Sequence, residues 1–130
     1  MIGHSYLPGE DPKTYIAREH AEIRSYLTLA ASSLAAGSRA SARRTLRRAR
    51  TDIEQHFAAE EADVFPLWAE LHPDLAPDLA ARIAEHPRLL RMLRTLDSRP
   101  FTRRELAKFI TEIEAHAARE ERLFAIIAGR

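Results

Sequence analysis

Apolar side chains recur every three to four residues along most of the chain, the spacing that places them on one face of a helix. Residues that break or cap helices interrupt this pattern at three places: Gly37-Ser38, His72-Pro73 with Ala76-Pro77, and Ser98-Arg99-Pro100. Asp11 before Pro12 and the capping box of Thr102 and Glu105 favour helix starts, and Gly129 ends the last apolar stripe. We therefore expect four amphipathic helices, over residues 12–36, 39–70, 77–97 and 103–128.

Long helices joined by such short connections pack as antiparallel neighbours. The expected fold is all-α, an up-down-up-down antiparallel four-helix bundle. One domain forms it over residues 12–130, after an N-terminal extension of residues 1–11. Pro66 and Pro87 fall inside helical patterns, so we expect them to kink their helices or to end them early.

The composition agrees with a helical protein and narrows its chemistry. Ala and Leu are frequent, whereas Val occurs once and Cys is absent among the 130 residues. Without Cys there are no disulfides, no thiolate catalysis, no iron–sulfur cluster and no cysteine-ligated zinc. The net charge is only +1, so we expect no attraction to nucleic acid, and the arginines between residues 39 and 50 are interpreted as a solvated face. We identify no signal peptide or membrane span and expect a cytoplasmic location.

Polar residues interrupt the apolar stripes, where they are expected to be buried: His20, His56, Glu60, His86, His116 and Glu120. Burying a carboxylate costs several kcal/mol unless it is paired or binds a metal ion. Because no Lys or Arg lies in the same stripes, the two carboxylates require a cation from elsewhere.

The spacing of these residues brings them together. A Glu follows a His by one helical turn in two helices, at residues 56–60 and 116–120, so each pair shares a helix face. In an antiparallel hairpin, residues equally far from the turn lie at the same height, and successive histidines are nearly equidistant from the turn between them. We therefore expect four histidines in one layer, with both carboxylates displaced to the same side. Four imidazoles and two carboxylates that can bridge form a ligand set for two metal ions.

The stripes also repeat. His56-x-x-x-Glu60-Glu61-x-x-x-Phe65 is related to His116-x-x-x-Glu120-Glu121-x-x-Phe124, and the preceding helices share Glu19-His20 and Glu85-His86. The chain thus consists of two copies of one unit, Glu-His followed by His-x-x-x-Glu-Glu.

This pattern resembles the hemerythrin-like family, whose members are also called HHE cation-binding domains, over roughly residues 12–128. Phe65-Pro66 after Glu60-Glu61 is similar to a common form of that family's second helix. The resemblance implies a four-helix bundle around two non-heme iron ions with an oxo or hydroxo bridge, with zinc or manganese as substitutes. By position, it implies His20, His56, His86 and His116 as terminal ligands and Glu60 and Glu120 as bridges.

The sequence departs from the oxygen-carrying hemerythrins, which have a fifth histidine in a His-x-x-x-His pair of the third helix. Arg82 stands four residues before His86, where the fifth histidine would be. The remaining set is similar to that of di-iron proteins linked to iron–sulfur cluster repair, so reversible oxygen carriage is not expected. Ferritin-like di-iron proteins use Glu-x-x-His, and no Glu lies three residues before any of these histidines.

Several neighbouring residues have candidate supporting roles. Asp52 and Glu112 each lie one turn before a histidine, where they are either exposed helical carboxylates or acceptors of its free ring N–H. Arg82 is predicted to contact a bound anion or a bridging carboxylate, or else to reach solvent. The remaining candidates are expected to be solvated or to pack rather than to bind metal: Glu61, Glu121, Tyr15 and Tyr26.

Three kinds of function fit these observations. The preferred one is a module that binds or senses O2, NO or peroxide, or serves iron homeostasis. The alternatives are an enzyme that decomposes peroxide or NO or donates iron for cluster repair, and a structural bundle without metal. Expected partners are a small diatomic ligand or peroxide and an unidentified protein, with neither nucleic acid nor a membrane, for a monomer or homodimer.

Overall fold

The computed structural model describes residues 12–130, and the extension 1–11 with its expected cap Asp11 lies outside the described residues. Its elements are α1 (Pro12–Ala35), α2 (Arg39–Ala59), the π-helix η1 (Glu60–Val64), α3 (Phe65–Leu71), the 3₁₀-helix η2 (Pro73–Leu75), α4 (Ala76–Asp97) and α5 (Arg103–Ala128). These bounds agree closely with the four helices expected from the sequence, because the polypeptide stays helical from α2 through η1 into α3.

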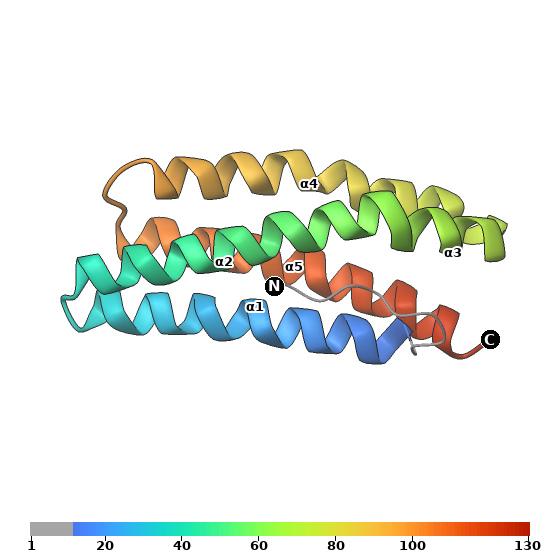
Figure 1. Ribbon diagram of the computed structural model, residues 1–130, viewed down its shortest axis with the longest axis horizontal. Coiled ribbons are helices and arrows are strands. Elements are labelled where there is room, and N and C mark those ends of the chain that lie inside the picture. The colour runs from blue at the N-terminus through green and yellow to red at the C-terminus, as the bar shows by residue number, and fades with distance from the viewer. Residues whose placement is uncertain (1–11) are drawn as a thin grey trace.

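The helices form an antiparallel four-helix bundle (Figure 1). Helix α1 packs against α2 and α5, and α4 packs against α5, α2 and α3. Helices α2, η1 and α3 together form one continuous helical segment of the bundle. Short turns join it to α1 and α4, and α4 to α5, so the chain runs up, down, up and down, as expected. Among residues 12–130, no helix combines the length and the apolar composition that crossing a membrane requires.

The helix ends follow the capping residues of the sequence with one difference. Gly37 adopts a φ of 83°, a left-handed conformation that glycine reaches without strain. Thr102 and Glu105 form the complete capping box at the start of α5. Ser38 occupies the cap position of α2, but its side chain makes no capping hydrogen bond.

The π-helix η1 is a feature that the sequence analysis did not predict. The backbone N–H of Phe65 bonds to the carbonyl of Glu60, five residues earlier, which widens the helix by one residue. Pro66 explains its position, because a proline ring in a regular α-helix clashes with the carbonyl four residues earlier. The repeat shows the same extra residue: three residues separate Glu61 from Phe65, whereas two separate Glu121 from Phe124.

Phe65 and Phe124 therefore both reach the core, although they follow their Glu-Glu pairs at different distances along the sequence. Phe65 and Phe124 are at most 1% exposed, and their ring centroids lie 5.5 Å apart. Pro87 differs from Pro66 in its local structure: α4 stays α-helical through Pro87 from Ala76 to Asp97, with no π-helical segment before it, and does not end early.

The core consists of two apolar clusters with a polar layer between them. One cluster fills the half of the bundle nearer to the α1–α2 and α4–α5 turns and includes Leu46 and Phe109. The other fills the opposite half and includes Phe65, Trp68 and Phe124. In each long helix, the histidine predicted as a ligand lies where one cluster gives way to the other.

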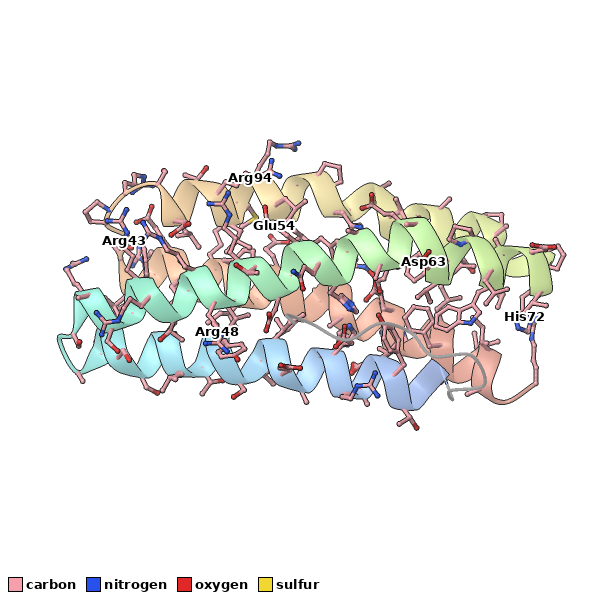
Figure 2. The ribbon with its side chains drawn as sticks, in the orientation of Figure 1. Arg43, Arg48, Glu54, Asp63, His72 and Arg94 are labelled. Carbon is pink, nitrogen blue, oxygen red and sulfur yellow. The ribbon has the colours of Figure 1, made fainter. Side chains whose placement is uncertain are left out.

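The arginine-rich start of α2 is more than a solvated face. Asp97, which is 8% exposed at the end of α4, lies 3.2 Å from Nε of Arg47 and 2.8 Å from Nη1 of Arg50. Arg43, which Figure 2 labels near one end of the bundle, donates to the backbone carbonyl of Asp97 at 3.3 Å. These arginines therefore tie α2 to the end of α4.

Candidate metal centre

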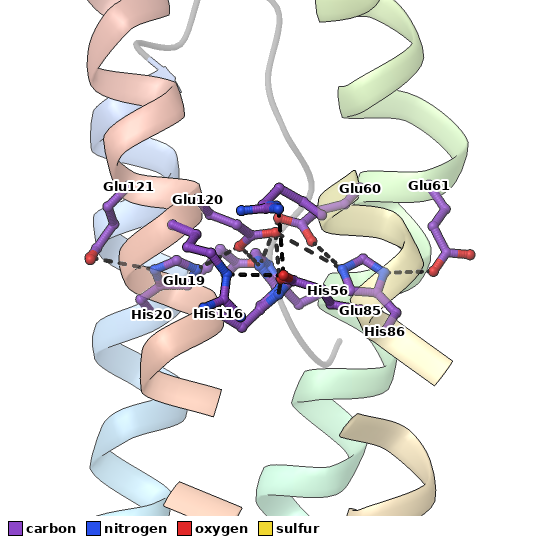
Figure 3. A network of polar contacts seen from close by, with 12 residues as sticks. Glu19, His20, His56, Glu60, Glu61, Glu85, His86, His116, Glu120 and Glu121 are labelled. Carbon is purple, nitrogen blue, oxygen red and sulfur yellow. Dashed lines mark hydrogen bonds and ion pairs between the residues drawn. The ribbon is translucent and has the colours of Figure 1, made fainter. Parts of the chain in front are cut away.

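Four imidazoles, one from each long helix, meet near the middle of the bundle (Figure 3). His20 comes from α1, His56 from α2, His86 from α4 and His116 from α5, and each is at most 6% exposed. The ring centroids of His20 and His56 lie 5.5 Å apart, and those of His86 and His116 lie 5.1 Å apart. The structure thus brings together the histidine layer that the spacing predicts.

Glu60, the first residue of η1, lies between two of these imidazoles and is fully buried. Its Oε2 is 3.2 Å from Nε2 of His56, and its Oε1 is 3.1 Å from Nε2 of His86. The carboxylate therefore directs one oxygen toward an imidazole of the α1–α2 hairpin and the other toward an imidazole of the α4–α5 hairpin.

Glu120 in α5, also fully buried, is arranged in the same way. Its Oε1 is 3.1 Å from Nε2 of His20, and its Oε2 is 3.1 Å from Nε2 of His116. Two groups of possible ligand atoms result, each with all its atoms within 4.8 Å of one another: His20, His56 and Glu120, and Glu60, His86, His116 and Glu120.

The chemistry of this donor set fits metal ions. Within residues 12–130, no hydrogen bond satisfies Nε2 of His56, His86 or His116, either oxygen of Glu60, or Oε2 of Glu120. Buried polar atoms are rarely left in this state unless something else binds them. Atoms that share a metal ion at about 2.1 Å and about 90° lie roughly 3 Å apart, close to the nitrogen–oxygen distances given above.

Without a metal ion, protons on the imidazoles balance the negative charge of the buried carboxylates. Burial alone would lower the pKa of His86, but the neighbouring carboxylates of Glu120 and Glu60 outweigh it and raise that pKa to about 9. Burial also opposes the charged form of His56, yet the charge of Glu60 raises its pKa well above the usual value. The converse holds for Glu120: burial would raise its pKa, but contact with the imidazoles lowers it well below the usual range. A metal ion that binds here must therefore displace protons.

The second ring nitrogen of every imidazole faces a carboxylate from a neighbouring helix. The contacts between Nδ1 and a carboxylate oxygen are His20–Glu121 at 3.5 Å, His56–Glu19 at 3.4 Å, His86–Glu61 at 2.7 Å and His116–Glu85 at 2.6 Å (Figure 3). Such carboxylates fix the tautomer and the orientation of a metal-binding imidazole.

Sequence reasoning missed these four outer carboxylates, although each one is the direct neighbour of a predicted ligand. We expected Glu61 and Glu121 to be solvated, and they are 46% and 43% exposed while still contacting an imidazole. A side chain one position along a helix points about 100° away from its neighbour, which here is toward the adjacent helix. The repeated Glu-His and Glu-Glu pairs were the signal that could have identified them.

Of the two other residues with candidate supporting roles, Glu112 differs from its candidate role as an acceptor, and Asp52 does not yet have an assigned contact with a histidine. Glu112 forms two hydrogen bonds with Arg88 at 2.9 and 3.2 Å on the surface, and Nδ1 of His116 faces Glu85 instead. Asp52 is buried, but Nδ1 of His56 lies against Glu19, so the role of Asp52 stays a prediction.

Arg82 reaches the layer indirectly. Its Nη2 lies 3.5 Å from Oε2 of Glu85, the carboxylate whose other oxygen contacts His116. Arg119 donates to the same Oε2 at 2.9 Å, and contact with His116 and Arg119 outweighs burial and lowers the pKa of Glu85. Arg82 therefore supports an outer carboxylate in this structure.

Tyr15 and Tyr26 pack in the bundle, as expected. The ring of Tyr15 is fully buried, with its centroid 6.3 Å from that of His56, and burial is the main cause that raises the pKa of its hydroxyl. The ring of Tyr26 lies under the guanidinium of Arg48, 5.4 Å away.

Comparison with known proteins adds one match. The family model described as Hemerythrin HHE cation binding domain matches residues 11–127 of the chain. No curated protein and no solved structure matches the chain significantly.

Proposed function

Because the chain belongs to the hemerythrin HHE cation-binding domain family, we propose that its histidine layer holds two iron ions and binds a small ligand such as O2, NO or peroxide. His20 and His56 would hold one ion, and His86 and His116 the other. Glu60 and Glu120 would be shared between them. The role of each residue as a ligand is part of this proposal.

One observation carries the proposal. Each fully buried carboxylate divides its two oxygens between the two histidine pairs, with all four nearest nitrogen–oxygen distances at 3.1 or 3.2 Å. A carboxylate that bound a single cation would need to direct its oxygens toward one histidine pair only. The division therefore favours two ions rather than one.

Bound iron supplies redox and ligand-binding chemistry that no side chain of this protein offers. The chain supplies the donor atoms, their orientation through the outer carboxylates, and the exclusion of bulk water by the two apolar clusters. With Arg82 where a fifth histidine would be, this chain would supply the same number of ligands to each of the two ions. We therefore expect the reduced protein to oxidise in air rather than to bind O2 reversibly.

The test begins with metal content. Protein purified without oxygen and given ferrous iron should contain about two irons per chain, and the optical spectrum should change on addition of NO, azide or peroxide. Glu60→Ala should lower the iron content strongly, and Glu112→Gln should leave it unchanged. A folded sample that binds no metal would contradict the proposal, and a spectrum that cycles reversibly with oxygen pressure would contradict the non-carrier part.

The same iron-loaded sample separates binding from catalysis. Multiple turnovers of peroxide or NO per iron centre would favour the enzyme alternative. A stoichiometric spectral change without turnover would favour a binding or sensing module. Substitution by zinc or manganese should preserve the metal content and abolish the iron spectrum, which separates the donor set from the chemistry of the metal.

A further inference from the structure

An apolar cavity adjoins the histidine layer between α1, α2 and α5. Its volume is about 30 Å³, and its inner wall includes the rings of His20, His56 and His116. The other buried residues around it are apolar: Ile23, Leu27, Phe57, Ile113 and Ala117. A single water needs roughly 10–15 Å³ by the same measure, so the space suits a molecule of about two heavy atoms.

Two charged residues also line this cavity, and they are its most exposed members. Arg24 of α1 and Glu114 of α5 complete its lining, and both side chains are 50% exposed. Nε of Arg24 lies 3.3 Å from Oε1 of Glu114, so an ion pair joins the two helices where the cavity meets the surface. The lining thus combines a half-exposed ion pair, buried aliphatic side chains and the imidazoles of the layer.

We infer that the Arg24–Glu114 pair is a charge-neutral cover that admits small uncharged molecules to the centre and slows the admission of anions. The inference rests on the proposed function, because it treats the histidine layer as the place where the ligand acts. An ion that crosses the aliphatic stretch loses its hydration and gains no polar partner in exchange, whereas a neutral diatomic molecule loses little. The paired charges give an approaching anion no net attraction.

Removing one charge at a time should change the admission of anions in opposite directions. Glu114→Gln leaves Arg24 unpaired and should accelerate azide binding to the oxidised iron protein by about fivefold at low salt. Arg24→Gln leaves Glu114 unpaired and should slow it by a similar factor. Stopped-flow spectra give these rates. NO, which is uncharged, should react at rates within about twofold of the parent in both variants.

A matched control separates a local cover from the general field of the protein. Glu112 lies two positions before Glu114 on α5 and pairs with Arg88 at the surface, outside the cavity. Glu112→Gln removes the same charge and should leave the azide rate unchanged. If Glu112→Gln accelerates azide as much as Glu114→Gln does, or if the two cover variants shift azide and NO alike, the inference is overturned.

A measurement without metal tests the cavity itself. Xenon under pressure should produce saturable methyl shifts of Ile23, Leu27 and Ile113 in metal-free protein. Ala117→Leu should fill the space and abolish the shifts, whereas Ala118→Leu, an exposed change at the next position, should preserve them. Unshifted methyls in the parent overturn the inference whether or not iron binds. Shifted methyls in a protein that binds no iron would contradict the proposed function and leave the cavity established.

Discussion

Each imidazole of the layer is held from both sides, by a shared buried carboxylate at Nε2 and by an outer carboxylate at Nδ1. The outer contacts differ in exposure: Glu19 is 4% exposed and Glu85 25%, whereas Glu61 and Glu121 are nearly half exposed. Each proposed ion would therefore have one imidazole backed by a more buried carboxylate, Glu19 or Glu85, and one backed by a more exposed carboxylate, Glu121 or Glu61. The outer residues are as much a part of the centre as the donor atoms.

Removing an outer carboxylate should weaken metal binding without removing a donor atom. Glu85→Gln loses the negative charge at 2.6 Å from Nδ1 of His116 and should lower the affinity for metal by about 10- to 100-fold. Competition with a chelator for zinc measures this affinity. Glu112→Gln is the control, and equal affinities of the two variants would contradict the role assigned to Glu85.

Removing both buried carboxylates should separate metal binding from folding. The double variant Glu60→Leu, Glu120→Leu should bind no metal, because it lacks both shared ligands. In the metal-free state it should be as stable as the metal-free parent or about 1–4 kcal/mol more stable, because two buried charges are replaced by apolar side chains. Urea denaturation of both metal-free proteins measures the difference. A double variant that unfolds at much lower urea would show that these positions do not tolerate apolar side chains.

At the level of elements, helix limits followed from the sequence and helix irregularity did not. Gly37, the capping box and the prolines after His72 and Ala76 act locally, so their effect on helix ends can be predicted from neighbouring residues alone. The π-helix depends on which helical register lets Phe65 reach the core after Pro66, a tertiary requirement. The outer carboxylates were missed for a related reason, since each acts on a histidine of a different helix.

The extra residue of η1 should be removable. Deleting Ala62 together with Pro66→Ala leaves two residues between Glu61 and Phe65, the same number as between Glu121 and Phe124 in α5. Phe65 should therefore keep its place in the core. Deleting the exposed Ala107 from α5, a regular helix, rotates every following side chain by about 100°. Thermal unfolding should therefore show a folded Ala62 variant and a severely destabilised Ala107 variant. Equal destabilisation would contradict the interpretation of η1 as a one-residue insertion.

The start of α5 should respond to pH through Glu105. The guanidinium of Arg99 and the backbone N–H of Thr102 lower the pKa of this carboxylate to about 2, below its usual value near 4.5. The stabilisation that this charge contributes is therefore present above about pH 4.5 and is lost as the pH falls toward 2. Glu105→Gln should be less stable than the parent at pH 7, and the difference should shrink over this range. A difference that does not vary with pH would mean that the charge is not what stabilises the helix start.

At the scale of the whole molecule, the polar layer divides the core and contains side chains from all four long helices of the bundle. Four histidines from four helices converge because any two successive ones lie nearly the same number of residues from the turn between their helices. Their meeting could therefore be predicted without coordinates. The pairing of His20 with His56 and of His86 with His116 could not, because it depends on how the carboxylate oxygens are rotated. The proposed ions would join the α1–α2 hairpin to the α4–α5 hairpin through Glu60 and Glu120.

The most direct test of this account is iron-edge anomalous diffraction from crystals of the iron-loaded protein. The account predicts two anomalous peaks per chain, one beside Nε2 of His20 and His56 and the other beside Nε2 of His86 and His116. Both peaks should lie within bonding distance of Glu60 and Glu120. A single peak, or peaks outside the histidine layer in a well-folded crystal, would contradict the two-ion centre.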